Sequence, residues 1–392
     1  MKIGSFSLIK ELNTSLILNT IRERKSISRA DIAKTTGLTA ATVTNITGEL
    51  LKYKLISETS FGKSTGGRKP IMLEFNASEY HILGVVISRQ EITVALTDLN
   101  SNPISIKTYY PEKIPTPAEA LNKVARDAEC LISASDKRVL GIGVSMEGLI
   151  DEKKGICVLS SNFSWKSVDI KGELFKRLGL PVFVNNDVKA LAKGEEMFGK
   201  AKTSDNFILL YISYGIGAAL VNKGKIYRGA TNYACEIGHM TLDINGPLCS
   251  CGNKGCFQAL ASGEALIYEI RKNKLEGLFG KKEISVKDIS EKIKENDKII
   301  LELIKKQAFY IGTGIANIIN IFNPSEIIIN GYISSAPDFI KAIIKDEINK
   351  KTLPGIKEDA NVLFSHMEDE GKYKGAVGLF ISELFDNPEV FF

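Results

Sequence analysis

The chain has 392 residues, of which 44% are hydrophobic and 25% are charged, a balance typical of globular proteins with more than one domain. No apolar run approaches the roughly 20 residues that a membrane-spanning helix needs. The first residues lack the basic and apolar regions of a signal peptide, and we therefore expect a cytoplasmic protein without a membrane partner.

The net charge of +5 is concentrated at one end of the chain. Residues 1–76 contain twelve Lys and Arg against six Asp and Glu, whereas the remaining residues contain 39 against 40. The positive excess therefore lies within the first fifth of the sequence. Such an asymmetry favours contact with nucleic acid at that end, although basic termini are also common in other proteins.

The first 76 residues have the pattern of a winged helix-turn-helix domain. Apolar residues at helical spacing predict a first helix, and two shorter helices follow, with Ser28 and Thr39 as their N-caps and Gly37 in the turn between them. This order is the helix-turn-helix arrangement. The basic, glycine-rich segment of residues 57–70 is typical of a wing. A small helical bundle with a basic linker is the alternative.

Short polar side chains on the outer face of the second helix of this motif suit hydrogen bonds to base edges or phosphates. An arginine at the tip of a wing can enter a narrow minor groove. The predicted DNA-binding residues are Arg29, Thr39, Ala40, Thr42, Thr44, Asn45, Lys63 and Arg68.

From Tyr80 onward, short strand-like runs alternate with helical segments. The first series has three strand-like runs, a helix near residues 117–133, strands at 139–144 and 180–184, and a helix at about 188–198. A second series begins at Phe207 and repeats a similar order. Two similar α/β halves predict a duplicated pair of lobes with a cleft between them. The predicted fold class is α/β. The predicted domains are the winged helix-turn-helix domain at residues 1–76, a first α/β lobe at 77–190 and a second lobe at 191–392.

The stretch of residues 236–258 has the most specific pattern in the chain. His239, Cys249, Cys251 and Cys256 place one imidazole and three thiols within eighteen residues. Four such ligands are what Zn²⁺ takes in a closed, tetrahedral structural site. A loop of this length also needs something to fold around. The alternative is a chance grouping of reduced cysteines, and a disulfide is disfavoured because Cys249 and Cys251 are too close to bridge easily.

This stretch resembles the signature of the ROK family, which comprises repressors, open reading frames and sugar kinases. The resemblance covers nearly the whole chain. Residues 184–187 (Val-Asn-Asn-Asp) resemble the family's sugar-binding turn, residues 161–163 (Ser-Asn-Phe) resemble its upstream sugar loop, and Glu236 with His239 resembles its Glu-x-Gly-His pair. The resemblance implies an actin-like, two-lobed sugar-kinase fold behind the winged helix. Within the family, the extension resembles that of the xylose-repressor and N-acetylglucosamine-repressor branch.

The resemblance also implies a monosaccharide site. In the family's kinases the residue matching Asp187 is the general base that takes a proton from a sugar hydroxyl, although Asp187 could also cap its own helix. His239 would bind zinc through one ring nitrogen and donate to the sugar through the other. Gln258 stands where the family usually has Glu, which leaves the identity of the sugar open. The implied sugar-binding residues are Ser145, Asn162, Asn186, Asp187, Glu236, His239 and Gln258.

Three stretches depart from the family's ATP-binding pattern. The Asp-x-Gly-Gly-Thr-Lys turn of the kinases corresponds to residues 86–91, which lack both glycines and add a carboxylate. Residues 214–217 keep the second phosphate loop only in part, and residues 330–332 replace a run of glycines in the adenosine turn. Phosphoryl transfer depends on positioned charge stabilisation at the phosphates, so we expect no kinase activity.

We therefore predict a sugar-responsive transcriptional repressor of carbohydrate-utilisation genes, with xylose among the candidate sugars. Its expected partners are operator DNA, a monosaccharide effector and a further copy of itself, as a homodimer or a dimer of dimers, and its expected cofactor is structural Zn²⁺. The alternatives are an ATP-dependent sugar kinase with a regulatory headpiece and an interaction protein whose headpiece binds another protein. The sequence leaves open whether the sugar releases the protein from DNA or promotes its binding.

Overall fold

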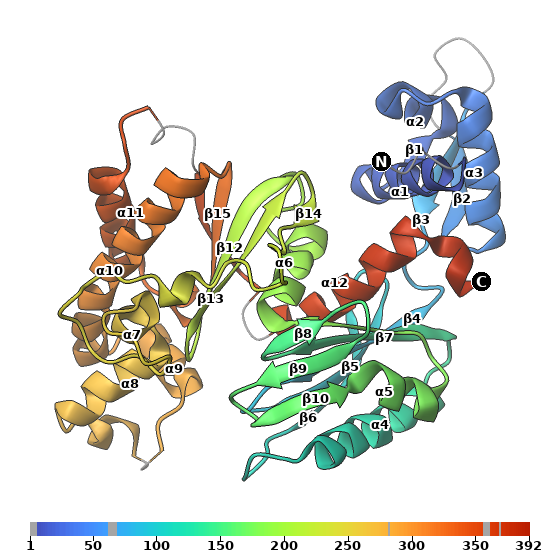
Figure 1. The fold of residues 1–392 in the computed structure, drawn as a ribbon. Coiled ribbons are helices and arrows are strands. Elements are labelled where there is room, and N and C mark those ends of the chain that lie inside the picture. The colour runs from blue at the N-terminus through green and yellow to red at the C-terminus, as the bar shows by residue number, and fades with distance from the viewer. Residues whose placement is uncertain (1–5, 62–68, 281–282, 356–360, 368–369) are drawn as a thin grey trace. The chain divides into compact units, whose positions relative to one another are not determined.

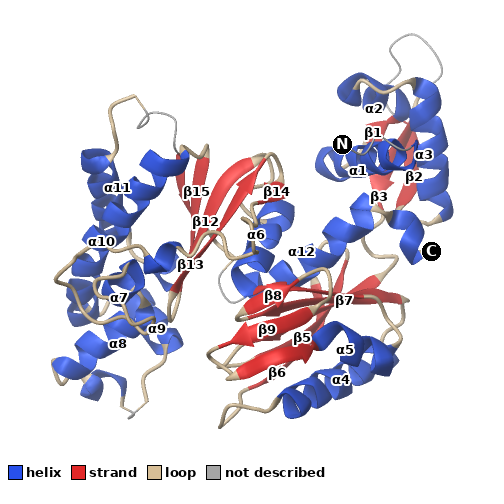
Figure 2. Ribbon diagram, in the orientation of Figure 1, coloured by secondary structure: helices blue, strands red, loops and turns tan. Residues whose placement is uncertain are grey.

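The computed structural model of the chain describes residues 6–61, 69–280, 283–355, 361–367 and 370–392. These residues divide into two compact units, shown in Figures 1 and 2. The first unit comprises Met1–Asn185 and Ala376–Phe392, and the second comprises Asn186–Gly375. No helix among the described residues is both long and apolar enough to cross a membrane. The predicted domain limits at residues 76 and 190 stay predictions.

The first unit begins with a helical headpiece, by which we mean residues 6–61 and 69–76. It contains α1 (Phe6–Arg24), β1 (Ile27–Ser28), α2 (Arg29–Thr36), α3 (Ala40–Lys52), β2 (Ile56–Phe61) and β3 (Ile71–Phe75), with its sheet in the order β1-β3-β2. The predicted caps are confirmed. The Ser28 side chain accepts from the Asp31 amide, Thr39 accepts from the Thr42 amide, and Gly37 ends α2 with a φ of 72°.

The rest of the first unit is an α/β lobe. Its main sheet has the order β11-β7-β4-β5-β6, and a smaller sheet has the order β10-β9-β8. The lobe contains β4 (His81–Ile87), β5 (Ile92–Asp98), β6 (Pro103–Tyr109), α4 (Pro117–Ser133), β7 (Val139–Met146), β8 (Leu149–Asp151), β9 (Ile156–Ser160), β10 (Trp165–Asp169), α5 (Ile170–Leu178) and β11 (Val182–Asn186). Every residue of β4 and β7 is buried, which explains their nearly continuous apolar runs.

The second unit has a sheet in the order β14-β13-β12-β15-β16. Its strands are β12 (Asn206–Ile212), β13 (Ile216–Asn222), β14 (Lys225–Ile226), β15 (Glu326–Gly331) and β16 (Asn361–Phe364). Its helices are α6 (Asp187–Phe198), η1 (Ile237–His239), α7 (Phe257–Ala261), α8 (Gly263–Lys272), η2 (Glu276–Phe279), α9 (Val286–Lys294), α10 (Lys298–Phe322), η3 (Tyr332–Ser335) and α11 (Asp338–Lys351). Residues of α8, α9, α10 and α11 join those of β12 and β15 in one large apolar core.

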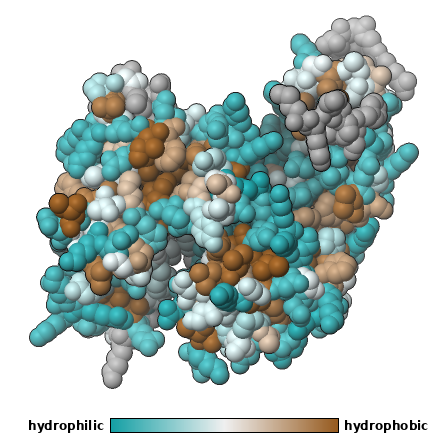
Figure 3. Space-filling view, in the orientation of Figure 1, coloured by the Kyte–Doolittle hydropathy of each residue, from teal (hydrophilic) through white to brown (hydrophobic). Residues whose placement is uncertain are grey.

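The two main sheets share one pattern, which confirms the predicted duplication. In the first unit β4 is antiparallel to β5 and parallel to β7, and β5 is antiparallel to β6. In the second unit β12 is antiparallel to β13 and parallel to β15, and β13 is antiparallel to β14. Each sheet therefore places an antiparallel meander on one side of its central strand and a parallel strand on the other. Hydrophilic residues cover most of the face in Figure 3, as expected when each unit encloses its own core.

Helix α12 (Glu370–Asp386) follows the second sheet and ends the chain together with the short helix η4 (Pro388–Phe391). Its first residues belong to the second unit and the remainder to the first unit.

Candidate metal centre and sugar-binding residues

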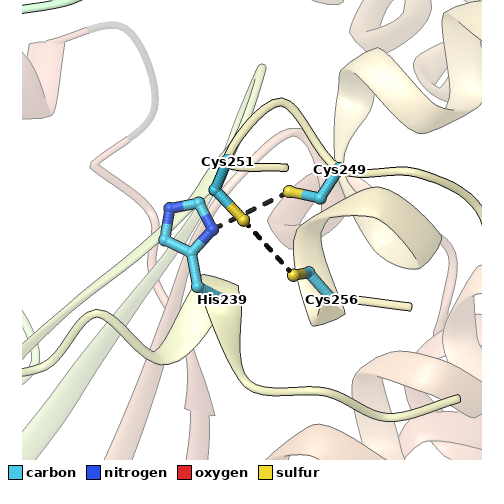
Figure 4. Close-up of side chains that lie close together, drawn as sticks. All are labelled: His239, Cys249, Cys251 and Cys256. Atoms are coloured by element: carbon cyan, nitrogen blue, oxygen red, sulfur yellow. Dashed lines mark hydrogen bonds between the residues drawn. The ribbon is translucent and has the colours of Figure 1, made fainter. Parts of the chain in front are cut away.

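One imidazole and three thiols meet in the second unit, in the loop between β14 and α7 (Figure 4). The ligand atoms of His239, Cys249, Cys251 and Cys256 all lie within 4.8 Å of one another. The distance is 3.7 Å from His239 Nδ1 to Cys249 Sγ and 3.7 Å from Cys251 Sγ to Cys256 Sγ. Four ligands arranged tetrahedrally about 2.3 Å from a common centre lie about 3.8 Å apart. The side chains therefore fit one tetrahedral ion.

The ends of this loop are fixed by secondary structure. His239 is the last residue of η1, and Cys256 is the N-cap residue of α7. An isolated β-bridge pairs Thr241 with Cys256, so that the two ends of the loop run side by side. The first and last ligands are thereby brought together by backbone hydrogen bonds.

The two middle ligands lie on a tight turn. The Cys249 amide donates to the Asn253 carbonyl over 2.7 Å, and the Gly252 amide donates to the Cys249 carbonyl over 2.9 Å. Gly255 has a φ of 66°, and a Cβ built on it would lie 1.5 Å from the Asp243 carbonyl oxygen. Only glycine fits at this position, because a side chain would force the loop apart and separate the ligands.

The electrostatics of the cluster also suit a cation. Burial raises the pKa of the Cys249 thiol, but hydrogen bonds from Cys251 and His239 outweigh it and lower that pKa to about 6. Burial and the neighbouring thiols instead raise the pKa of Cys256. Three adjacent thiols do not all ionise by themselves, whereas a divalent cation would stabilise three thiolates together. With four protein ligands, such a site has no open position for a catalytic water.

Gln258 contacts this cluster directly. Its side-chain amide donates to Cys249 Sγ over 3.5 Å and to Ser250 Oγ over 3.4 Å. Its position in the first turn of α7 would thus make it an outer partner of any metal held by Cys249, whatever it does toward a sugar. His239 has a complementary arrangement. Its Nδ1 faces Cys249, which leaves Nε2 as the nitrogen on the other side of the ring.

The predicted turn at Asn186 and Asp187 lies where β11 leads into α6. Asn186 caps the helix, with its side-chain oxygen accepting from the amides of Val188 (3.1 Å) and Lys189 (3.3 Å). The side-chain nitrogen of Asn186 donates to Asp187 Oδ1 over 2.8 Å. Capping therefore falls to Asn186, and the Asp187 carboxylate is held at the positive end of the helix dipole, where a negative charge is favoured.

Two residues that the sequence did not single out support the approach to Glu236. Lys189 Nζ donates to the Asn232 carbonyl over 3.0 Å, which fastens the segment before Glu236 to the first turn of α6. Cys235 has a φ of 73° and packs against the core of the second unit. A non-glycine residue in this conformation is strained by roughly 1–2 kcal/mol. The helix dipole disfavours a positive charge in the first turn of a helix. The presence of Lys189 in that position was therefore the sequence signal that could have indicated its structural role.

The remaining predicted sugar residues belong to the first unit. Ser145 is buried near the end of β7. The Asn162 side chain donates to Glu147 Oε2 over 3.0 Å, and the Arg89 amide approaches the same oxygen at 3.4 Å. Glu147 was also missed by sequence reasoning. It orients Asn162 and joins the turn of residues 88–91 to the end of β7.

The backbone amides of the turn between β4 and β5 are engaged within the first unit. The Ser88 amide donates to the Glu91 carbonyl over 2.9 Å, and the Glu91 amide donates to Ser88 Oγ over 3.1 Å. The Arg89 amide is directed toward Glu147. Three of the four amides of this turn, those of Ser88, Arg89 and Glu91, are thus directed at protein oxygens. Such backbone donors cradle phosphates in other proteins.

The glycines that remain in residues 214–217 and 330–332 serve packing in the second unit. A Cβ on Gly217 would lie 2.7 Å from the Val188 side chain, and a Cβ on Gly331 would lie 1.9 Å from the Ile212 carbonyl oxygen. The Tyr332 hydroxyl is buried and donates to Gln307 Oε1 over 2.8 Å. Burial raises the pKa of Tyr332, so the phenol stays neutral.

In the headpiece, α3 presents the predicted DNA-binding residues opposite its buried face. Val43, Ile46 and Leu50 are buried. The residues on the exposed or half-buried side are Thr39, Ala40, Thr42, Thr44 and Asn45. Two of the three threonine hydroxyls bond to each other, Thr39 to Thr42 over 2.9 Å, and Thr44 donates to the Ala40 carbonyl.

The basic DNA-binding candidates are placed differently. The Arg29 guanidinium donates to Thr47 Oγ1 over 3.1 Å and to Glu58 Oε1 over 2.8 Å, and so ties α2 to α3 and β2. These bonds give Arg29 a role inside the headpiece beside the predicted contact to DNA. Lys63 and Arg68 lie outside the described residues.

Known proteins resemble this chain along most of its length. The ROK family matches residues 82–383. The "Xylose repressor" of Bacillus spizizenii is 32% identical over 388 residues, which are 98% of this chain and 99% of that protein. A solved ROK family transcriptional regulator, described as a homolog of the E. coli MLC protein, has a TM-score of 0.83 and 29% identity, with 97% of each chain covered. A ROK family glucokinase from Streptomyces griseus, solved with glucose and AMPPNP, has a TM-score of 0.65 and 26% identity, with 76% of this chain and 98% of that chain covered.

Proposed function

The chain belongs to the ROK family, and we propose that it is a sugar-responsive transcriptional repressor of carbohydrate-utilisation genes. One observation carries the proposal. Similarity to a named repressor and to a solved transcriptional regulator extends over nearly the whole chain, whereas the glucokinase accounts for about three quarters of it. A transcriptional regulator needs a helix-turn-helix headpiece in addition to the sugar-kinase fold, whereas a kinase does not need one.

The headpiece binds operator DNA through α3. Its exposed side carries small and polar residues, from Thr39 to Asn45, that allow close approach to a major groove and hydrogen bonds to base edges. The basic residues of the wing, Lys63 and Arg68, supply charge toward the backbone. A homodimer, or a dimer of dimers, would place two such helices on the two halves of a palindromic site.

The body binds a monosaccharide, with xylose as the first candidate because the repressor from Bacillus spizizenii is named for that sugar. Asp187 and Asn186 at the start of α6, together with Glu236, provide the carboxylate and amide groups that sugar hydroxyls require. His239 Nε2 donates to the same ligand while Nδ1 binds zinc. Ser145, Asn162 and Gln258 complete the proposed set.

The cysteine and histidine cluster holds a structural Zn²⁺. Its support is the tetrahedral spacing of the four ligand atoms and the soft, N and S composition of the set. When bound, the ion supplies the charge that keeps three thiolates together and fixes the orientation of the His239 ring. The chain itself contributes a hydrogen bond to one of the ligands, because the Gln258 amide donates to Cys249 Sγ.

The protein does not turn over ATP. In support, the amides of Ser88, Arg89 and Glu91 are directed at protein oxygens, and Glu91 adds a negative charge to that turn. Asp187 favours a kinase as the alternative, because it stands where ROK kinases have their general base. Incubation with ATP and a sugar panel discriminates, and robust sugar phosphorylation would refute the repressor assignment.

Xylose binding is tested by thermal shift with a matched pair of variants. Asp187→Asn and Asp338→Asn each remove the carboxylate of the first residue of a helix in the second unit. Both variants lose the favourable interaction of a carboxylate with the helix dipole, which lowers their stability by a similar amount of about 0.3–1 kcal/mol. In wild type and Asp338→Asn, xylose at a hundredfold excess over Kd should stabilise the protein by about 2.7 kcal/mol. Asp187→Asn should show no shift, and an undiminished shift would remove Asp187 from the site.

A further inference from the structure

The C-terminal segment connects parts of the chain that are distant in sequence. Helix α12 starts in the second unit and continues into the first unit from Ala376. Residues 387–392, which we call the C-terminal strap, follow it and contain η4. One continuous helix is therefore shared by the two units, and its last turn contacts the headpiece (Figure 1).

At its start, α12 packs backbone to backbone against α6, the helix that begins at Asp187. A Cβ built on Gly375 would lie 2.8 Å from the carbonyl group of Ala190, and one built on Gly194 would lie 2.9 Å from the Cα of Gly375. Such close approach is possible because both helices have glycine at the crossing. A displacement of α6 would therefore displace α12, since the two backbones meet directly at Gly194 and Gly375.

The next residues of α12 rest on the sheet of the first unit. A Cβ on Gly143 would lie 1.8 Å from the Ala376 carbonyl oxygen, and one on Gly141 would lie 2.2 Å from the Phe380 ring. Gly375 and Ala376 are neighbours in sequence, yet one is packed on α6 and the other on β7. The helix thus passes from the second unit to the first at this pair of residues.

The far end of α12 is fastened to the headpiece. The Phe385 ring is buried and meets the Phe75 ring edge-on, with centroids 5.4 Å apart. The Arg22 guanidinium lies over the Phe385 ring at 5.2 Å, and Ser15 Oγ donates to Asp386 Oδ1 over 3.1 Å. Aromatic rings packed in this way stabilise the folded state by about 0.5–1.5 kcal/mol more than the burial of their surface alone.

The strap itself is held between the headpiece and the first lobe. The Phe392 ring stacks on Tyr53, just after α3, with centroids 4.9 Å apart and an interplanar angle of 14°. Lys10 bridges Glu389 of the strap and Glu49 of α3. On the other side, Arg138 donates to the Phe391 carbonyl over 3.0 Å. The strap thus contacts α1 and the end of the predicted DNA-reading helix directly.

We propose that α12 and the strap form a lever that couples ligand binding at the start of α6 to the orientation of the DNA-binding headpiece. The inference rests on the proposed function, and it adds the route by which a sugar controls DNA binding. A sugar that moves α6 pulls the start of α12, the helix turns about Gly375 and Ala376, and Phe385 and the strap move the headpiece. The reorientation changes the spacing of two headpieces in a dimer, which operator geometry does not tolerate.

The first test measures hydrogen–deuterium exchange of the full-length protein without ligand. The variants are Phe392→Ala and a truncation after Asp386, and the matched control is Val390→Ala, whose side chain is 68% exposed in the same segment. Peptides from α1 and α3 should exchange about tenfold faster in both test variants, because the headpiece loses its anchorage, and should be unchanged in the control. Unchanged exchange in Phe392→Ala would overturn the lever even where the truncation fails to fold.

The second test measures coupling. Fluorescence anisotropy with a duplex from upstream of the protein's own gene gives the loss of DNA affinity caused by D-xylose. In wild type and Val390→Ala the loss should lie in the 5- to 150-fold range of allosteric coupling, and in Phe392→Ala it should fall below about twofold. Affinity for DNA alone and the xylose thermal shift should persist in Phe392→Ala. A full effect of xylose on DNA affinity in Phe392→Ala would contradict the lever. If xylose gives no thermal shift in the wild-type protein, the proposed sugar is wrong, and the hydrogen–deuterium exchange measurement alone decides the lever.

Discussion

The residue choices around the metal cluster follow from hydrogen-bond chemistry. Gln258 stands where the family usually has Glu, and its amide nitrogen lies 3.5 Å from Cys249 Sγ. An amide can donate to a thiolate, whereas a carboxylate at the same place would only accept and would repel it. In this chain the Gln258 amide therefore supports a candidate metal ligand, in addition to any effect on the choice of sugar.

Changing Gln258 to Glu should weaken zinc binding. Loss of an outer-sphere partner typically lowers metal affinity 10- to 100-fold, and we expect at least about tenfold for Gln258→Glu. Competition with a chromophoric chelator measures the affinity. Gln90→Glu makes the same chemical change in the first unit and should leave the affinity unchanged. Wild-type zinc affinity in Gln258→Glu would show that its amide does not support Cys249.

Single residues also mark the limit of what the sequence could tell. The clustering of His239 with the three cysteines was predictable, because spacing and chemistry coincide within eighteen residues. Lys189 and Glu147 were not, because each binds a partner that is distant along the chain. The positive φ of Cys235 has no sequence signal, since cysteine gives no hint of a left-handed backbone.

At the scale of elements, local signals were sufficient for the headpiece. Ser28, Gly37 and Thr39 define the ends of α2 and α3 through short-range bonds that the sequence displays. The repeated strand order likewise predicted two similar sheets. The division of α12 between two units could not be predicted, because it depends on close contacts of Gly375 and Gly143 with elements far away in the chain.

Replacing Gly143 by alanine tests the docking of α12 on β7, and replacing Gly48 by alanine serves as the control. The two changes should shift the free energy of unfolding in opposite directions. Gly143→Ala places a methyl group against the Ala376 carbonyl and should destabilise the first unit by about 1–3 kcal/mol. Gly48→Ala, in α3 with nothing within 4 Å, should stabilise the headpiece by about 0.5–1 kcal/mol. Chemical denaturation measures both. Equal effects at the two positions would show that α12 is not closely docked on β7.

At the scale of the whole molecule, a DNA-reading headpiece and two lobes of a sugar-kinase fold form one chain. The charge distribution separates the two tasks, since the positive excess lies in residues 1–76 and the remainder is nearly neutral. The positive charge of the headpiece does not depend on the sugar, so we expect the sugar to act by changing the orientation of the headpiece rather than its charge. A full switch of occupancy from 1:99 to 99:1 would need a preference of about 10⁴-fold for the released state. The expected coupling of about 5- to 150-fold therefore shifts the occupancy of the operator without switching it fully.

The most direct test of the repressor assignment measures DNA binding with and without sugar. Fluorescence anisotropy of wild-type protein on a duplex from upstream of its own gene should show binding that weakens steeply with salt, by about 10³-fold or more between 50 and 200 mM for six or more phosphate contacts. D-xylose should lower the affinity at fixed salt by at least about fivefold. Binding that is absent at low salt, or that is the same with every monosaccharide tried, would contradict a sugar-responsive repressor.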